Sequence, residues 1–179
     1  MNQSVPLRVP RPDEPRPLTP VYFYTQQERE TMESRRIAVR GIAFEDGKLF
    51  AVKHKEKDGA ESDFWAIPGG GLDPGESLED GLHREMIEEM GVAPKIGKLL
   101  FIQQYRSEKR EFLEFFFHIE NADDYRSVDL STTTHGHLEL SRCGFIGPAS
   151  EYVLPDFLQT IDIETQISSH QPVHVVSYL

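Results

Sequence analysis

The sequence has one cysteine, no long apolar run and too few basic residues to balance its acidic ones. Cys143 cannot form a disulfide within the chain, which is compatible with a reducing compartment. No apolar stretch approaches the roughly 20 residues that a membrane-spanning helix needs. The N-terminus also lacks the apolar region of a signal peptide. We therefore expect a cytoplasmic protein that does not enter a membrane.

Acidic residues dominate the charge balance. The 30 Asp and Glu against 19 Lys and Arg give a formal net charge of −11. Non-specific binding to nucleic acid or to an anionic membrane needs a basic face, so the composition argues against both. An anionic small molecule remains compatible with this charge if a metal cation mediates its contact with the protein.

The distribution of proline suggests how the chain is divided. Six of the twelve prolines fall in residues 1–20, where they exclude regular helix and central strand. We interpret residues 1–33 as an extended arm, for which a role in a homodimer stays open. We expect one domain over residues 34–165 and a C-terminal tail over 166–179. Within this tail, residues 173–179 are either a strand or a docking segment.

Apolar alternation and turn signals predict the elements of the domain. Strands are predicted over 36–44, 48–54, 64–68, 95–106, 111–119 and 142–147, with a hairpin turn at Asp46–Gly47. A helix is expected from the N-cap Ser77 to Gly91, and a second one over 149–161 with Pro155 at its start or kinking it. Residues 120–141 are polar and irregular. This order predicts a mixed α/β sandwich.

Three glutamates of the first predicted helix, Glu85, Glu88 and Glu89, crowd one turn. At about 100° per residue, Glu85 and Glu89 fall on or beside the apolar stripe, whereas a solvated acidic face would lie opposite it. Half-buried carboxylates need a proton, a basic partner or a metal. Arg84 is the only permanently charged basic residue of this turn. A hard cation, Mg²⁺ or Mn²⁺, therefore explains the cluster best.

The stretch from Gly70 to Val92 resembles the Nudix box, G-x5-E-x7-R-E-U-x-E-E-x-G-U, in which U is a bulky apolar residue. Every fixed position of this motif is filled, by Gly70, Glu76, Arg84, Glu85, Met86, Glu88, Glu89, Gly91 and Val92. The flanking hairpin, the "WAIPGG" lead-in and the later predicted helix extend the resemblance loosely over about residues 34–165.

The resemblance implies a fold and an activity. The fold is a Nudix-type α/β/α sandwich with a mixed β-sheet. The activity is metal-dependent hydrolysis of the diphosphate linkage in a nucleoside diphosphate joined to another moiety X. The implied metal ligands are Glu85, Glu88, Glu89 and the main-chain carbonyl of Gly70. Glu76 and Arg84 are implied to form an ion pair that orients the box.

Candidate substrate-binding residues lie before and after the box. Gly70 and Gly71 belong to a loop that can bring backbone close to metal and phosphate. Trp65, with its neighbour Phe64, can stack on a base, although aromatic residues beside a strand are more often core. Tyr105 lies a few residues before the tyrosine that marks diadenosine-polyphosphate hydrolases, and we retain it as a candidate.

Other polar features have more ordinary interpretations. His135 and His137 have a strand-like spacing that would direct both rings one way, but a structural zinc site needs four ligands. A polar substrate loop is the preferred interpretation of these two histidines. Arg106, Lys109 and Arg110 are interpreted as a solvated turn. Gly81, in the middle of the helix, is attributed to close packing of the helix on the sheet.

The sequence leaves the identity of X open, and two rival functions remain. The proline that marks ADP-ribose hydrolases is missing, because no proline lies between Pro94 and Pro148. One rival is a nucleotide-sensing Nudix module without turnover, against which the intact acids argue. The other is an enzyme like isopentenyl-diphosphate isomerase, which depends on a cysteine near its site. Cys143 lies far downstream of the box.

Overall fold

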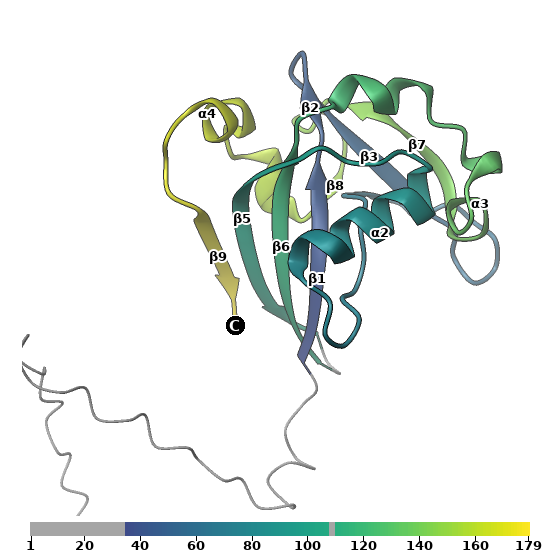
Figure 1. Cartoon of the computed structure of the whole chain (residues 1–179), viewed down its shortest axis with the longest axis horizontal. Coiled ribbons are helices and arrows are strands. Elements are labelled where there is room, and N and C mark those ends of the chain that lie inside the picture. The colour runs from purple at the N-terminus through teal and green to yellow at the C-terminus, as the bar shows by residue number, and fades with distance from the viewer. Residues whose placement is uncertain (1–34, 108–109) are drawn as a thin grey trace, which may run out of the picture. The chain divides into compact units, whose positions relative to one another are not determined.

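The computed structural model describes residues 35–107 and 110–179, and it has two mixed β-sheets with helices beside them (Figure 1). The predicted arm, residues 1–33, lies outside the described residues. The mixed α/β fold predicted from the sequence is confirmed, with two sheets in place of one. Within 35–107 and 110–179, no helix is both long and apolar enough to cross a bilayer.

The first sheet has the strand order β1-β6-β5-β9. Its strands are β1 (Arg35–Ile42), β5 (Ile96–Arg106), β6 (Glu111–Ile119) and β9 (His174–Tyr178). The β1–β6 and β5–β9 pairs are parallel, and β5–β6 is antiparallel. The segment expected to be a C-terminal tail therefore contributes a strand, β9, at the edge of this sheet.

The second sheet has the order β2-β3-β4-β8, with β7 paired to β3. Its strands are β2 (Phe44–Glu45), β3 (Lys48–His54), β4 (Trp65–Ala66), β7 (Leu140–Ile146) and β8 (Val153–Leu154). The predicted hairpin turn is confirmed, because Asp46 and Gly47 connect β2 to β3 with φ values of 49° and 71°. The second strand of this hairpin, β3, lies at the centre of the sheet.

Helix α2 (Leu78–Met90) begins and ends where the sequence predicts. The Ser77 hydroxyl accepts a hydrogen bond from the backbone N–H of Asp80, and Gly91 ends the helix in the left-handed conformation. The helix packs on β1, where Gly41 leaves room for the sulfur of Met86. The reason given for Gly81 was wrong: a Cβ there would meet Leu72 of the preceding loop, not the sheet.

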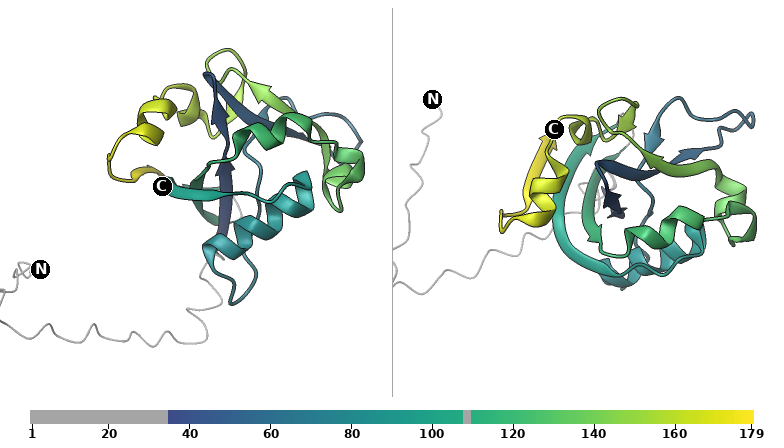
Figure 2. Two further views of the ribbon diagram at one scale, coloured as in Figure 1. Left: turned by 45° about the horizontal axis from the view of Figure 1, so that its top comes forward. Right: turned by 90° about the horizontal axis from the view of Figure 1, so that it is seen from above.

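Two core clusters lie on opposite faces of the first sheet, whose ribbon Figure 2 shows from two further sides. One joins Val39 and Phe117 of the sheet to the apolar face of α2. The other joins Phe101 and Phe116 to the second sheet, to η3 (Asp156–Gln159) and to α4 (Ile163–Ser168). Because adjacent strand residues face opposite sides, Phe116 and Phe117 belong to different clusters. Helical segments thus lie on both sides of this sheet.

The prediction of a helix over 149–161 was wrong. This segment contains β8 and the short 3-10 helix η3, and the helical turn that follows, α4, begins after the N-cap Asp162. The residue before a proline prefers extended backbone, and Leu154, before Pro155, indeed pairs with Ala66 of β4. The segment 120–141, predicted as irregular, contains three short helices, η1 (Ala122–Ser127), η2 (Leu130–Thr132) and α3 (Gly136–Glu139), and the first two residues of β7.

Candidate active site

Glu89 is the most deeply buried acid of α2. Glu89 is 5% exposed, and its burial agrees with the helical phase. Its Oε2 accepts a hydrogen bond from the Gly69 N–H at 3.0 Å. Burial raises the pKa of Glu89 from its ordinary value of 4.5 to about 7, against the opposing effect of the Gly69 hydrogen bond and of Arg40. The carboxyl group therefore titrates near neutral pH.

Glu85 lies directly against the glycine loop before the helix. A Cβ built on Gly70 would lie 2.4 Å from the carboxyl carbon of Glu85, so only glycine permits this approach. The Gly70 carbonyl accepts a hydrogen bond from the Val39 N–H at 2.9 Å. A carbonyl oxygen has a second lone pair, so this bond leaves Gly70 able to contact a cation.

Arg84 connects the other acids of the box. Its Nε and Nη2 donate to the two carboxylate oxygens of Glu76 at 2.9 and 3.0 Å, which is the ion pair that the resemblance implies. Its Nη1 reaches Glu85 at 2.9 Å and Glu88 at 3.3 Å. Nη2 also donates to the carbonyl of Gly71 at 3.0 Å. These hydrogen bonds lower the pKa of Glu76 and fix the loop to the helix.

His135 contacts this cluster, but not in the way the sequence suggested. Its Nδ1 lies 3.1 Å from Oε2 of Glu88, whereas Nδ1 of His137 lies 2.7 Å from the carbonyl of Thr133. The strand-like arrangement was wrong, because Gly136 begins helix α3. The helix packs so closely on the end of α2 that a Cβ on Gly136 would lie 2.0 Å from the Glu89 carbonyl.

The acids fit a hard cation in the chemistry of their donor atoms. Three carboxylates project from consecutive turns of α2, and one of them occupies space that a side chain at Gly70 would fill. Oxygen donors of this kind suit Mg²⁺ or Mn²⁺. Across 35–107 and 110–179, no three acidic, histidine or cysteine side chains already form a metal-binding group. Glu85 and Glu88 share Arg84 instead, and Glu89 contacts Gly69.

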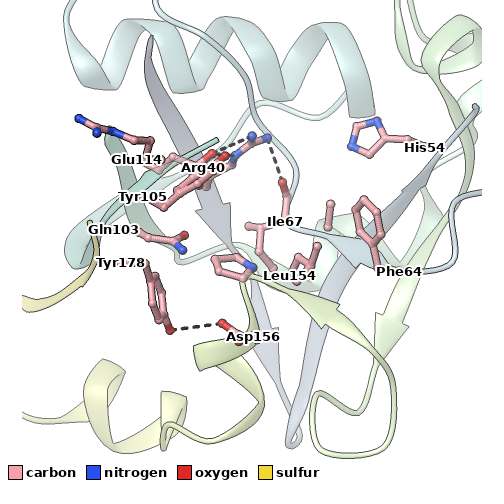
Figure 3. A pocket seen from close by; sticks show the side chains of 13 residues that line it. Arg40, His54, Phe64, Ile67, Gln103, Tyr105, Glu114, Leu154, Asp156 and Tyr178 are labelled. Carbon is pink, nitrogen blue, oxygen red and sulfur yellow. Dashed lines mark hydrogen bonds and ion pairs between the residues drawn. The ribbon is translucent and has the colours of Figure 1, made fainter. Parts of the chain in front are cut away.

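A cavity of about 560 Å³ opens beside the glycine loop (Figure 3). Arg40 connects the two, since its Nη1 donates to the Gly69 carbonyl at 2.6 Å and its Nη2 to Glu114 at 3.0 Å. Gly69 thus bonds Arg40 through its carbonyl and Glu89 through its N–H. The lining residues are Arg40, His54, Phe64, Ala66, Ile67, Gln103, Tyr105, Arg106, Glu114, Leu154, Pro155, Asp156 and Tyr178.

The floor of the cavity continues the face of the first sheet that carries the core residues Phe101 and Phe116. Two positions further along β5 and β6, this face changes from apolar to polar at Gln103 and Glu114, which lie opposite each other in the strand register. Across the cavity, the Tyr178 hydroxyl of β9 lies 3.3 Å from Asp156 (Figure 3). The cavity therefore combines a polar floor with aromatic walls.

Of the predicted substrate-binding residues Tyr105 and Trp65, only Tyr105 lines the cavity. Tyr105 lines the cavity and stacks on Phe112, with ring centroids 4.7 Å apart. Trp65 is buried in the core and does not line the cavity, whereas its neighbour Phe64 does. Lys53 and Arg142 both lie over the Trp65 ring, 5.5 and 5.0 Å from its centroid, and the Trp65 Nε1 donates to Glu151. The core interpretation of Trp65 therefore agrees with the structure.

The arginines on either side of the turn after β5 are exposed, as the interpretation of a solvated turn expects, and each also lines a hollow. Arg106 lines the cavity. Arg110 lines a second, more polar cleft of about 490 Å³, together with Arg36 and Glu85. Lys109 lies outside the described residues.

Sequence reasoning missed most of the polar residues of the cavity, which are Arg40, His54, Gln103, Glu114, Asp156 and Tyr178. A signal for two of them is present. Gln103 lies between Phe101 and Tyr105 in the alternating pattern of its strand, and Glu114 lies likewise between Phe112 and Phe116. A polar residue at an inward position of two neighbouring strands is unusual for a core and typical of a binding site.

Comparison with known proteins agrees with this arrangement. The chain is 36% identical over 75 residues to an ADP-ribose pyrophosphatase of Methanocaldococcus jannaschii, which is 42% of either chain. It is 29% identical over 98 residues to a MutT-like protein of Streptomyces ambofaciens, covering 54% of this chain and 59% of the relative. The chain thus spans between two fifths and three fifths of the length of these two curated relatives.

Solved structures share the fold. The E. coli ORF135 protein is 19% identical, with a TM-score of 0.58 over 77% of this chain and 95% of that one. A UDP-X diphosphatase is also 19% identical, with a TM-score of 0.58 over 87% of this chain and 70% of that one. The sequence model of the NUDIX domain matches residues 34–138, more than half of the 179 residues. With the whole box on α2 and the loop before it, the chain belongs to the NUDIX domain family.

Proposed function

We propose that the protein is a Nudix pyrophosphohydrolase that cleaves the diphosphate linkage of a nucleoside diphosphate joined to another moiety X, using Mg²⁺ or Mn²⁺. One observation carries the proposal. The acids Glu85 and Glu89 contact the Gly69–Gly70 loop, and Arg40, which donates a hydrogen bond to the Gly69 carbonyl, lines a cavity large enough for a nucleoside. Family membership and the names of the relatives support the same reaction class.

The cation would be held by Glu85, Glu88, Glu89 and the Gly70 carbonyl. When bound, it would neutralise charge on the phosphoryl oxygens and lower the pKa of the attacking water. Arg84 orients Glu85 and Glu88 through its Nη1 and ties the Gly71 carbonyl to the helix. A carboxylate of the three accepts the proton of the water. Arg40 binds the Gly69 carbonyl and so fixes the position of the loop relative to the cavity that would receive the nucleoside.

The structure offers no observation that favours the rival functions. Cys143, on which an isomerase would depend, lies on β7, lines neither the cavity nor the second cleft, and packs beside the core under α2. Burial raises the pKa of its thiol, which makes it a poorer proton donor or nucleophile. A sensing module need not retain a carboxylate that acts as the base, whereas all three acids of the box are present.

A hydrolysis assay tests the proposal. The full chain is incubated with a panel of nucleoside diphosphate compounds and Mg²⁺, and phosphate is measured after phosphatase treatment of the products. We expect turnover that is lost in excess EDTA and restored by Mg²⁺. Glu88→Gln should lower kcat by about a hundredfold or more, whereas Glu79→Gln, an exposed acid on the same helix, should not change it. Full turnover in EDTA would refute the proposal.

A further inference from the structure

Gln103 lies on the floor of the cavity with an unsatisfied side chain. The residue is 6% exposed, and its Oε1 is buried without a hydrogen-bond partner in the described part of the chain. Figure 3 shows its amide directed into the space between Tyr105, Tyr178 and Leu154. Buried side-chain oxygens are nearly always paired in native proteins, so this oxygen calls for an explanation.

The neighbours of Gln103 explain why the protein itself does not satisfy the amide. Directly across the strand pair lies Glu114, an acceptor whose Oε1 already receives two hydrogen bonds from Arg40. On the other side, β9 places the apolar Val176 opposite Gln103. The side chain therefore has an acceptor and an apolar group as its strand neighbours, and neither of them can donate a hydrogen bond to its Oε1.

We propose that Gln103 recognises the base of the substrate by accepting a hydrogen bond from an exocyclic amine. The substrate class is then a nucleotide of adenine, guanine or cytosine in preference to uracil or thymine. The proposal rests on the proposed function in one respect, because it places the nucleoside in the cavity beside the box. The aromatic residues Phe64, Tyr105 and Tyr178 line the same space and suit a flat ring.

The chemistry of the floor favours an amine over a carbonyl. Gln103 Oε1 and the Glu114 carboxylate are adjacent acceptors, and an exocyclic amine brings two N–H groups to such a pair. Uracil and thymine carry carbonyl oxygens in place of the exocyclic amine and offer a single ring N–H on the same edge, so they can pair at most one of the two acceptors. Stacking on aromatic walls tolerates any base. Discrimination between bases therefore falls to Gln103.

Nucleotide binding tests the role of Gln103 without requiring turnover. Titration calorimetry measures AMP, GMP, CMP and UMP binding to the full chain, in Mg²⁺, for the wild type, Gln103→Met and Gln104→Met. We expect the wild type to bind at least one amine-bearing nucleotide at least about tenfold more tightly than UMP. Gln103→Met should remove this preference. Gln104→Met should retain it, because Gln104 bonds Glu111 and does not line the cavity.

A thermal melt of the same variants distinguishes recognition from a structural role. Methionine preserves the length of the side chain and removes an unpaired buried oxygen, so Gln103→Met should melt at the wild-type temperature or above it. A lower melting temperature would make Gln103 a core residue and overturn the inference. Equal affinity for UMP, a preference that survives Gln103→Met, or no binding of any of the four nucleotides would also overturn it.

The outcome is separable from that of the proposed function. A chain that prefers amine-bearing nucleotides through Gln103 but hydrolyses no diphosphate compound would refute the hydrolase and keep the recognition. A chain that hydrolyses ADP-linked and UDP-linked compounds with equal kcat/KM would keep the hydrolase and refute the recognition.

Discussion

The backbone N–H of Gly69, in the glycine loop, donates a hydrogen bond to Oε2 of Glu89, on helix α2, at 3.0 Å. Gly69 has a φ of +123°, and a Cβ at this position would lie 2.2 Å from the carbonyl of Val39. Only glycine can therefore place its N–H at this point. The consequence is a carboxyl group that is buried and oriented by the backbone, with a pKa of about 7.

The raised pKa predicts how Glu89→Gln changes stability in EDTA. Below about pH 4.5 the carboxyl is protonated in both states. As the pH rises toward 7, the unfolded chain ionises while the folded protein retains the proton, so wild-type stability is lost over this window. Glutamine avoids this loss. We expect the variant to be more stable than the wild type by on the order of 3 kcal/mol at pH 8, with little difference at pH 4.

Denaturant melts in EDTA at several pH values measure this difference, and repeating them in millimolar Mg²⁺ gives a second reading. With the cation present the sign should reverse, because the wild type gains binding free energy that the variant largely lacks. A variant that is less stable than the wild type at pH 8 in EDTA would contradict the prediction. It would mean that the attraction between Arg40 and the Glu89 carboxylate outweighs the cost of burying this charge.

Arg84→Lys should impair the site without unfolding the protein. Lysine keeps the positive charge but loses the planar fork that bonds both oxygens of Glu76. The carboxylates of Glu85 and Glu88 then lose a fixed common partner. We expect kcat/KM to fall by about 10- to 100-fold and the Mg²⁺ concentration for half-maximal activity to rise. Unchanged metal dependence would mean that Arg84 does not orient these acids.

Gly70→Ala should reduce turnover selectively. The new methyl group would displace the Glu85 carboxyl, which is the flexible end of a side chain, so the fold should survive. A suitable control is Gly144→Ala on β7, where no atom lies within 4 Å of the added Cβ. We expect activity to fall by about tenfold or more in the first variant and to remain in the second. Circular dichroism verifies folding of both, and equal activities would contradict a role for the Gly70–Glu85 contact.

Tyr178→Ala should weaken substrate binding more than chemistry. Tyr178 lines the cavity on the side away from the box and reaches Asp156 through its hydroxyl. Loss of this wall should raise KM by about two- to tenfold and leave kcat nearly unchanged. Val175→Ala, at an exposed position of the same strand that does not line the cavity, serves as the control. A large fall in kcat would place Tyr178 nearer the reacting atoms than we infer.

The sequence predicts well what is encoded locally. The limits of α2, the turn at Asp46–Gly47 and the burial of Glu89 follow from caps, glycine positions and helical phase within short windows. The sequence predicts poorly what depends on distant partners. Leu154 is extended because it pairs with Ala66, 88 positions earlier in the chain. This pairing explains why 149–161 does not form the helix that its sequence pattern predicts.

The candidate site divides in the same way. The acids and glycines of the box share one continuous stretch, so spacing alone identifies them. The cavity is assembled from β1, β3, β4, β5, β6, β8, β9 and the segment after β8, and no spacing rule connects these segments. Arg40 illustrates the difficulty, because only the parallel pairing of β1 with β6 brings it to Glu114. The choice between base stacking and core for Trp65 depends on a distant segment in the same way, since Trp65 pairs with Val153 of β8.

One wall of the cavity comes from beyond the part of the chain that the family shares. Leu154, Pro155, Asp156 and Tyr178 all follow residue 138, where the match to the NUDIX domain ends, whereas Arg40 and Glu114 lie within it. The box and Gln103 thus lie in the shared part of the chain, whereas the opposite wall of the cavity does not. A chimera that exchanges residues after 146 between two such proteins should change the preference for the group X, while the box and the base preference set by Gln103 stay those of the recipient.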